Sequence, residues 1–223
     1  MGRFIVLDGL DGSGKGTQAE RLRDRLTAEG RQVRLISFPN YGTPGAAAVE
    51  CYLGGALGAD PSATNAYAAS TFYAVDRYLS WRTDWGQFLA ADDGNIVIAN
   101  RYTSANAVHQ LSKLPRAEWD GFLSWLGEFE FDRLGLPRPD LTVYLEMTPA
   151  ISMRLVSHRS AETGQKKDIH ELDPHHLEAS YAAALYAAKA WGWLRLPCYA
   201  DGEPKSIAEI GDAVWAAVQA VLS

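Results

Sequence analysis

Cysteine is scarce in this sequence, which has only Cys51 and Cys198 among its 223 residues. The two lie far apart, and neither belongs to a C-x-x-C pair or to a cysteine and histidine cluster with metal-ligand spacing. This pattern excludes a disulfide framework and a cysteine-based zinc site. We expect both thiols to be buried and apolar, in a reducing compartment.

An excess of positive charge is also missing. Lysine and arginine total 21 against 27 aspartates and glutamates, so the formal net charge is -6. Proteins that bind long nucleic acid normally present a basic surface. We therefore expect no long nucleic acid as a partner, and any nucleotide ligand to be small.

Long apolar runs, internal repeats and linkers rich in Pro, Gly or Ser are absent as well. The stretch RFIVLDG at residues 3–9 reads as a strand with no basic leader before it, and no run is long enough to cross a membrane. We expect a soluble, cytoplasmic protein without membrane contact, in which residues 1–223 form a single domain.

What the sequence does contain is a series of short apolar runs separated by helical segments. Residues from Thr17 to about Glu29 repeat apolar side chains at helical spacing, and Gly30 stands at the expected helix end. Alternating strands and helices predict an α/β three-layer sandwich: a five-stranded parallel sheet with helices on both faces and ligands at the carboxyl ends of the strands. The expected strands are residues 3–8, 32–38, 95–100, 141–147 and 193–199.

One polar segment interrupts this alternation. Residues 154–176, RLVSHRSAETGQKKDIHELDPHH, contain too few apolar side chains to belong to the core. We expect this segment to be a mobile lid.

The loop between the first strand and the first helix has the sequence DGLDGSGKGTQ at residues 8–18. It nearly matches G-x-x-x-x-G-K-[ST], with Gly9, Gly14 and Lys15 in place. Its glycines let backbone N–H groups approach a phosphate closely. Lys15, which we expect to be an exposed loop cation, adds positive charge at the terminal phosphates. A strand before the loop and a helix after it complete the pattern of a P-loop NTPase, so we predict a nucleoside triphosphate site.

Gly16 departs from this motif because it replaces the hydroxyl that usually contacts magnesium. Thr17, the next residue, or a water molecule must then take that place. Small nucleotide kinases of the adenylate type also read G-K-G-T. The departure therefore favours a small-molecule kinase over a GTPase switch.

Arginines paired with aromatic residues occur outside the loop. Tyr73 and Arg77 are four residues apart, one helical turn, so a flat ring and a planar guanidinium can face the same pocket. This combination suits a nucleobase, by stacking and hydrogen bonding. Taken alone, such a pair is more often an ordinary contact on a helix surface.

The chain resembles the thymidylate kinase family. The segments FIVLDGLDGSGKGTQ, SFPNYGT, FYAVDRY, IVIANRYTSANAVHQ and PDLTVYLEM occur in that family's order and spacing, and the ending DGEPKSIAEIGDAV continues the match. The resemblance implies a homodimeric phosphotransferase that uses ATP with Mg²⁺ to convert dTMP to dTDP. Two alternatives are a kinase for another nucleoside monophosphate and a nucleotide-binding regulator without phosphoryl transfer.

The resemblance also assigns roles to individual residues. Asp11 would reach the 3′-hydroxyl of the acceptor sugar, Tyr73 would stack on the thymine, and Arg77 would bond its exocyclic oxygen. The residues implied for ATP are Gly9, Asp11, Gly12, Ser13, Gly14, Lys15, Gly16 and Thr17. Those implied for the acceptor nucleotide are Asp11, Phe38, Pro39, Tyr73, Arg77, Arg101, Asn106 and Gln110.

Catalysis would depend on cations, because phosphoryl transfer requires alignment and positive charge around the transferring group. Lys15, Arg101 and Arg159 are the implied catalytic residues. Arg101 would hold the acceptor phosphate between the two nucleotides. Arg159, with Lys166 and Lys167, would close over the phosphoryl group as part of the lid.

Asn100 is a departure from the family, which usually has an aspartate before the Arg-Tyr pair as magnesium partner or acceptor activator. An amide cannot carry that charge. Asp8, at the end of the first strand, either supplies the missing carboxylate or accepts hydrogen bonds from loop amides as a structural residue. Thr17 and Asp8 are therefore the expected metal ligands.

Two more positions differ from the family pattern. Tyr41 stands where many members have an arginine that holds the acceptor phosphate, so Arg101 acts alone or with a lid residue. His109 stands where an aromatic ring commonly lies against the sugar and disfavours a 2′-hydroxyl. It either affects the selectivity for deoxynucleotides or is an ordinary polar residue of a helix.

Overall fold

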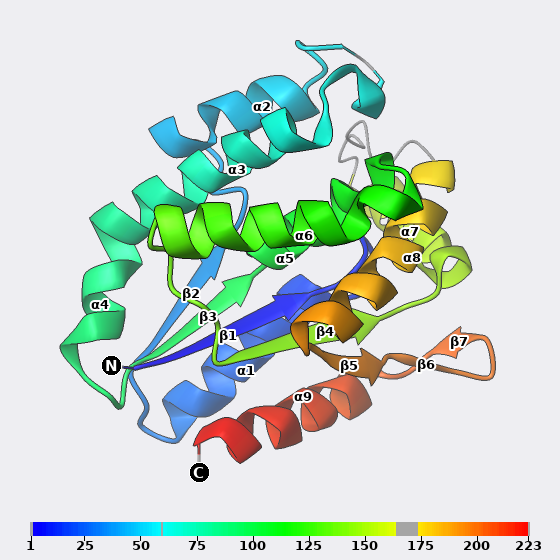
Figure 1. Cartoon of the computed structure of the whole chain (residues 1–223). Helices are drawn as coiled ribbons and strands as arrows, with labels where there is room; N and C mark the ends of the chain where they lie inside the picture. The colour runs from blue at the N-terminus through cyan, green and yellow to red at the C-terminus, as the bar shows by residue number, and fades with distance from the viewer. Residues whose placement is uncertain (1, 59, 164–173, 223) are drawn as a thin grey trace.

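The central feature of the fold is a parallel sheet (Figure 1). The computed structural model describes residues 2–58, 60–163 and 174–222, without the side chains of 61, 159–163 and 174. Five strands pair in the order β2-β3-β1-β4-β5, and all neighbours are parallel. The strands are β1 (Arg3–Asp8), β2 (Val33–Ser37), β3 (Ile96–Asn100), β4 (Leu141–Glu146) and β5 (Leu194–Pro197).

Both faces of the three central strands, β1, β3 and β4, are buried, which explains why these strands read as continuous apolar runs. Along β1, Ile5 and Leu7 belong to the cluster on one face, whereas Phe4 and Val6 belong to the cluster on the other. The predicted five-stranded parallel sheet and its P-loop fold class are confirmed. Each predicted strand lies within two residues of the observed bounds.

Helices cover both faces of the sheet (Figure 1). One face is covered by α1 (Lys15–Ala28) and α9 (Ile207–Leu222), which pack on each other. The opposite face carries α3 (Ala66–Ser80), the π-helix η3 (Trp81–Trp85), α4 (Gly86–Ala91), α5 (Thr103–His109), α6 (Trp119–Gly127), the π-helix η6 (Glu128–Arg133) and α8 (Pro174–Trp191). Shorter or peripheral elements are η1 (Pro44–Ala46), α2 (Ala47–Leu53), η2 (Pro61–Ala63), η4 (Leu111–Lys113), η5 (Arg116–Glu118) and α7 (Pro149–Thr163).

A small antiparallel hairpin after β5 was not predicted from the sequence. It pairs β6 (Tyr199–Ala200) with β7 (Glu203–Pro204), so the predicted strand at 193–199 covers β5 and the start of β6. Asp201 and Gly202 form its turn with φ of 51° and 78°. An Asp-Gly pair at two positive φ angles is the strongest local signal for a two-residue hairpin turn, and it was present in the sequence.

The two cysteines differ in environment. Cys198 is buried, as expected, but Cys51 is exposed, so the expectation of two buried thiols is wrong for Cys51. The short helix α2 buries only Val49 and Tyr52, which leaves Cys51 on its outer side. Among the helices of the described ranges, none has the length and hydropathy that crossing a membrane requires.

Candidate active site

A cavity of about 800 Å³ opens at the carboxyl ends of the strands. Because β1, β2 and β3 end side by side, the loops that follow them meet at this edge of the sheet. Most of the expected ligand-binding residues line it: Asp11, Gly12, Ser13, Gly14, Lys15, Gly16, Thr17, Phe38, Pro39, Tyr73, Arg77, Arg101, Asn106 and Gln110. The structure therefore brings together residues that are up to about half the chain apart.

The glycine loop forms one wall of the cavity. It joins β1 to α1, which begins at Lys15. Gly12 has a φ of 82°, and a Cβ there would lie 2.8 Å from the carbonyl oxygen of Ser152. Only glycine fits this conformation and this close approach. The loop backbone is thus held against α7 while the residues from Asp11 to Gln18 face the cavity.

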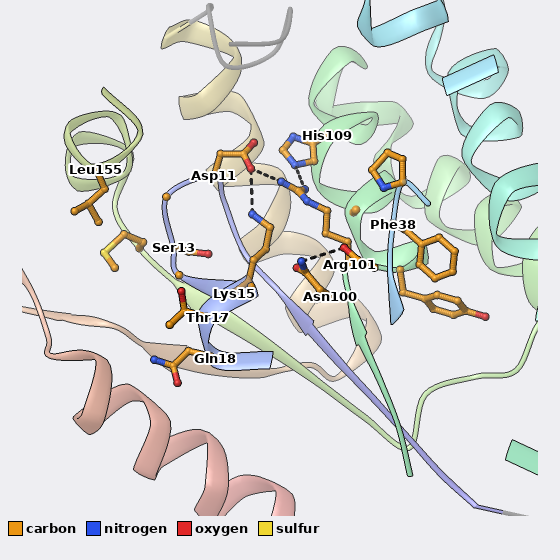
Figure 2. A pocket seen from close by; sticks show the side chains of 18 of the residues that line it. Asp11, Ser13, Lys15, Thr17, Gln18, Phe38, Asn100, Arg101, His109 and Leu155 are labelled. Atoms are coloured by element: carbon orange, nitrogen blue, oxygen red, sulfur yellow. Dashed lines mark hydrogen bonds and ion pairs between the residues drawn. The ribbon is translucent and has the colours of Figure 1, made fainter. Parts of the chain in front are cut away.

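Asp11 is the centre of a charged cluster in this wall (Figure 2). Its Oδ1 accepts from Nζ of Lys15 at 3.1 Å and from Nη2 of Arg101. Burial raises the pKa of Asp11, but the charges of Arg101 and Lys15 outweigh burial and hold that pKa well below its usual range. Asp11 is therefore ionised, and two cations converge on it.

Lys15 is less accessible than the sequence suggests. We expected an exposed loop cation, but the residue is 9% exposed, so that expectation is wrong. Its ammonium group also donates to the carbonyl of Leu10 at 3.2 Å. Burial, followed by the charge of Arg101, lowers the pKa of Lys15 from its ordinary value, against the opposing effect of Asp11.

Arg101 has an unusual backbone conformation, with a φ of 69°. The left-handed region is unfavourable for a residue with a Cβ, by roughly 1–2 kcal/mol. The backbone N–H of Arg101 donates to the carbonyl of Leu7 at 3.0 Å, which holds this turn against β1. The guanidinium then reaches both Asp11 and His109, whose Nε2 lies 2.8 Å from Nη1.

Arg77 lines one end of the cavity. Its side chain is 1% exposed and forms a double hydrogen bond with Glu130, from Nε at 2.7 Å and from Nη2 at 2.5 Å. Tyr73, one turn earlier on α3, lines the same cavity. The Tyr73 and Arg77 pair thus faces the cavity, and the alternative of an ordinary surface contact is wrong for Arg77. Sequence reasoning missed Glu130, which is 53 residues away and has no motif that marks it.

The opposite end of the cavity is mostly apolar and was not assigned from the sequence. Figure 2 shows Leu155, Thr17 and Gln18 on one side of Lys15 and Phe38 on the other, with Asp11 and Arg101 between them. The remaining residues at the Leu155 end follow β4, lie in or just after the β6–β7 hairpin, or belong to α9: Met147, Pro204, Lys205, Ile207 and Ile210. The cavity therefore has two ends that meet at the charged cluster.

Gly9 and Asp8 are not part of the cavity wall that the described residues form. Asp8 is fully buried, and its two oxygens accept from the backbone N–H of Gly9 at 2.8 Å and from Oγ of Ser104 at 2.5 Å. These contacts are those of a structural acceptor for the loop.

The expected lid is described only in part. Arg159 lies on α7, but its side chain is outside the described residues, and so are Lys166 and Lys167. The described parts of the lid, residues 154–163 and 174–176, are helical.

Asn100 ends β3 at the edge of the cavity. Its Nδ2 donates to Oγ of Ser37 at 3.1 Å, because the two residues are partners in the β2–β3 register. Its Oδ1 is buried and finds no hydrogen-bond partner among the described residues. Within that same part of the chain, no group of three or more His, Cys, Asp or Glu side chains is placed to hold a metal.

Tyr41 and His109, the other two departures, both line the cavity. Tyr41 is 60% exposed. His109 is almost buried, and its ring stacks on that of His176 with centroids 5.7 Å apart. His109 is therefore a partner of Arg101 and not an ordinary surface histidine.

Comparisons with known proteins agree on one family. The model of the thymidylate kinase family matches residues 7–190. The thymidylate kinase of Mycobacterium tuberculosis is 34% identical over 212 residues, which cover 92% of this chain and 95% of the relative. A probable thymidylate kinase of Staphylothermus marinus is 33% identical over 153 residues, covering 69% of this chain and 67% of that protein.

The solved structures extend the agreement to the fold. The thymidylate kinase of Candida albicans superposes with a TM-score of 0.70 over 98% of this chain and 92% of that one, at 20% identity. A likeness at that identity shows the fold, whereas the family model and the relative at 34% identity show the family. The chain belongs to the thymidylate kinase family.

Proposed function

We propose that this protein transfers the terminal phosphoryl group of ATP to dTMP, which gives dTDP and ADP. The observation that carries the proposal is the convergence of Lys15 and Arg101 between the two ends of one cavity. Membership in the thymidylate kinase family supports it. Two ends joined at a cationic centre suit two nucleotides whose phosphates meet there.

The two nucleotides are assigned by the chemistry of each end. The glycine loop with Lys15 holds the ATP phosphates, and the apolar end around Leu155 and Ile207 accepts the purine base. Tyr73 and Arg77 hold the thymine, with Phe38, Pro39, Asn106 and Gln110 beside it. Asp11, next to both phosphate-binding cations, is placed for the 3′-hydroxyl of the acceptor sugar.

Catalysis follows from position and charge. An oxygen of the dTMP phosphate attacks the terminal phosphorus of ATP in line with the leaving ADP oxygen. Lys15 and Arg101 stabilise the negative charge on the equatorial oxygens. Before nucleotides bind, both cations are paired with Asp11, so the phosphates compete with this carboxylate for them.

Magnesium accompanies ATP in this proposal, and the residues present fit it. The buried, unpartnered Oδ1 of Asn100 and the hydroxyl of the exposed Thr17 are hard oxygen donors beside the cavity. These two would hold the ion, which neutralises phosphate charge when it is bound. Asp8, whose two oxygens already accept hydrogen bonds, is not part of this metal site.

The lid is the remaining catalytic element of the proposal. Within one kinase domain, residues 154–176 close over the nucleotides and bring Arg159, Lys166 and Lys167 to the transferring group. The support is the polar composition of this segment and its attachment to α7, which packs on the glycine loop at Gly12. Closure excludes water and prevents the hydrolysis of ATP.

A homodimer is also part of the proposal. Tyr67, Val75 and Leu79 lie on α3 at helical spacing and are 38%, 45% and 39% exposed. The ring of Tyr67 contacts Trp125, which stacks on Phe129. This apolar face suits a second copy of the chain.

A cytoplasmic location is consistent with the exposed, unpaired Cys51.

An ATP-coupled assay across nucleoside monophosphates tests the function. We expect magnesium-dependent ADP formation with dTMP, and much slower formation with dGMP or dCMP, because a site that hydrogen-bonds one base edge rejects others. Preferred turnover of another monophosphate would identify a different kinase. The regulator is the second candidate, favoured by the uncharged Asn100, and it would bind ATP and dTMP without forming ADP.

A further inference from the structure

Glu130 is a fully buried carboxylate behind the acceptor end of the cavity. It lies on η6 and accepts both the Nε and the Nη2 hydrogen bonds of Arg77. Two donors on α5 reach the same carboxylate: Oγ1 of Thr103 at 2.7 Å from Oε2, and Nδ2 of Asn106 at 3.5 Å from Oε1. One acceptor group therefore connects two residues that line the cavity, Arg77 and Asn106.

The contact with Glu130 decides which edge of Arg77 a ligand can meet. A guanidinium has five N–H donors and no acceptor. Its Nε and one Nη2 hydrogen point to Glu130, so the edge formed by Nη1 and Nη2 is the one that a ligand can reach. Nη1 has a long contact of 3.4 Å with the carbonyl of Tyr102. Arg77 therefore presents hydrogen-bond donors to the cavity.

Asn106 has the opposite polarity for the same reason. Its Nδ2 donates to the carbonyl of Ser70 at 3.3 Å and to Oε1 of Glu130. Both partners are acceptors, so the amide nitrogen of Asn106 must point at them. The oxygen Oδ1 is then the atom that Asn106 offers to a ligand. The cavity wall thus combines a donor from Arg77 with an acceptor from Asn106.

This polarity matches one class of pyrimidine. Thymine and uracil have an acceptor at position 4 and an N–H donor at position 3. Cytosine has the reverse, an amino donor at position 4 and an acceptor at position 3. We propose that Glu130 is a positioning residue that fixes the hydrogen-bond polarity of the base site and so selects 4-oxo over 4-amino pyrimidines. The proposal rests on the proposed function for its assignment of the base end.

A glutamine at this position would keep the size of the side chain but not its polarity. Arg77 donates to both oxygens of Glu130, so the NH₂ group of a glutamine would face an Arg77 donor in either orientation and break one of these two hydrogen bonds. In one of the two orientations it would also face Nδ2 of Asn106, which donates too. The Asn106 amide can reverse and offer Nδ2 to the ligand, and Arg77 can leave its double contact. Glu130→Gln therefore tests the polarity itself.

Binding and turnover are measured together on the wild type, Glu130→Gln and Glu128→Gln. Glu128 is a matched control because it lies on the same π-helix, 55% exposed, in a pair with Arg133. Calorimetry gives the Kd of dTMP, dUMP and dCMP, and steady-state assays give KM and kcat. For Glu130→Gln we expect Kd for dTMP and dUMP to rise about tenfold to a hundredfold, as for loss of a charged hydrogen bond.

The other expected results distinguish positioning from a structural role. In Glu130→Gln the Kd of dCMP should not rise, KM for dTMP should rise more than kcat falls, and KM for ATP should stay the same. Glu128→Gln should match the wild type. A folded Glu130→Gln protein that keeps the wild-type ratio of dTMP to dCMP affinity overturns the inference, as does a wild type without preference for 4-oxo bases.

Breaking a buried ion pair can unfold a protein, so a second variant is needed. Thr103→Val removes one hydrogen bond to Glu130 and leaves the contact with Arg77. If Glu130→Gln does not fold, the ratio of dTMP to dCMP affinity in Thr103→Val decides: a decrease supports the inference and no change overturns it. A wild type that binds dTMP selectively but makes no dTDP contradicts the proposed function alone.

Discussion

Nε2 of His109 lies 2.8 Å from Nη1 of Arg101, and this contact fixes the state of the histidine ring. A guanidinium can only donate, so Nε2 must accept and the ring proton sits on Nδ1. Arg101 is thus held between two acceptors, Asp11 and neutral His109. At the position where the family commonly has an aromatic ring, His109 thus contacts Arg101.

Replacing His109 should therefore affect catalysis through Arg101. We expect His109→Phe, which has no acceptor, to lower kcat/KM for dTMP about tenfold, as for the loss of one hydrogen bond to a charged group. His109→Gln, which retains an acceptor, should lose less. Steady-state kinetics on both variants check this. Equal losses would show that ring shape and not the hydrogen bond matters.

Lys15→Met should abolish most of the activity and leave the fold intact. Methionine keeps the buried stem of Lys15 but removes the charge at the terminal phosphates, so we expect kcat to fall at least about a hundredfold. Asp11 keeps Arg101 as a partner, so the thermal unfolding temperature should change little. Lys189→Met, on the exposed side of α8, is the control. A normal kcat in a folded Lys15→Met protein would refute the role of Lys15 in phosphoryl transfer.

Lys113 gives a prediction about pH and stability. Burial lowers its pKa from 10.5 to about 8. Its ammonium group donates to the hydroxyl of Tyr52 at 2.6 Å and to the carbonyl of Thr64 at 3.3 Å. Between pH 8 and 10.5 the unfolded chain binds a proton at this lysine that the folded protein has released.

The sign of the effect follows from this difference in bound protons. Stability rises with pH where the unfolded state binds more protons, so the contribution of Lys113 should increase from pH 8 to 10.5. Its size is on the order of 1 kcal/mol, because the side chain is only partly buried. Lys113→Met should remove this increase and raise stability near pH 7. Urea unfolding of the wild type and Lys113→Met at several pH values measures this contribution. Identical pH profiles of stability for the two proteins would contradict the prediction.

The sheet was predictable because its signals are local. The continuous apolar runs, such as Phe4 to Leu7, follow from strands buried on both faces, and the glycine loop marks the turn into α1. The Asp201 and Gly202 turn was equally local and was overlooked. The exposure of Cys51 was not predictable, since it depends on how little of α2 is covered.

The site was predictable only where a motif carries it. Motif positions such as Tyr73 and Asn106 were expected at the cavity, and the structure places them there. Glu130 has no motif, and its role depends on a contact across 53 residues that only the folded chain makes. The burial of Lys15 is similar, because it results from Asp11 and Arg101 approaching from two loops.

Asn100→Asp tests the position where this chain departs from its family. The Oδ1 of Asn100 is a buried, unpartnered oxygen, so the wild type offers a neutral ligand where a carboxylate would bind magnesium more strongly. The Ser37 hydroxyl now accepts from Nδ2 and can instead donate to a carboxylate, so the local contact survives. We expect the half-saturating magnesium concentration to fall severalfold and dTDP formation to rise.

Asp8 determines whether this gain is realised. It lies on β1, the strand beside β3, and two carboxylates that lie close together repel each other. Both oxygens of Asp8 already accept hydrogen bonds, which favours faster dTDP formation by Asn100→Asp. Magnesium titrations of dTDP formation by the wild type, Asn100→Asp and Asn100→Ala distinguish the two outcomes. If Asn100→Asp is slower than the wild type while Asn100→Ala matches it, repulsion from Asp8 dominates and Asn100 is not a metal ligand.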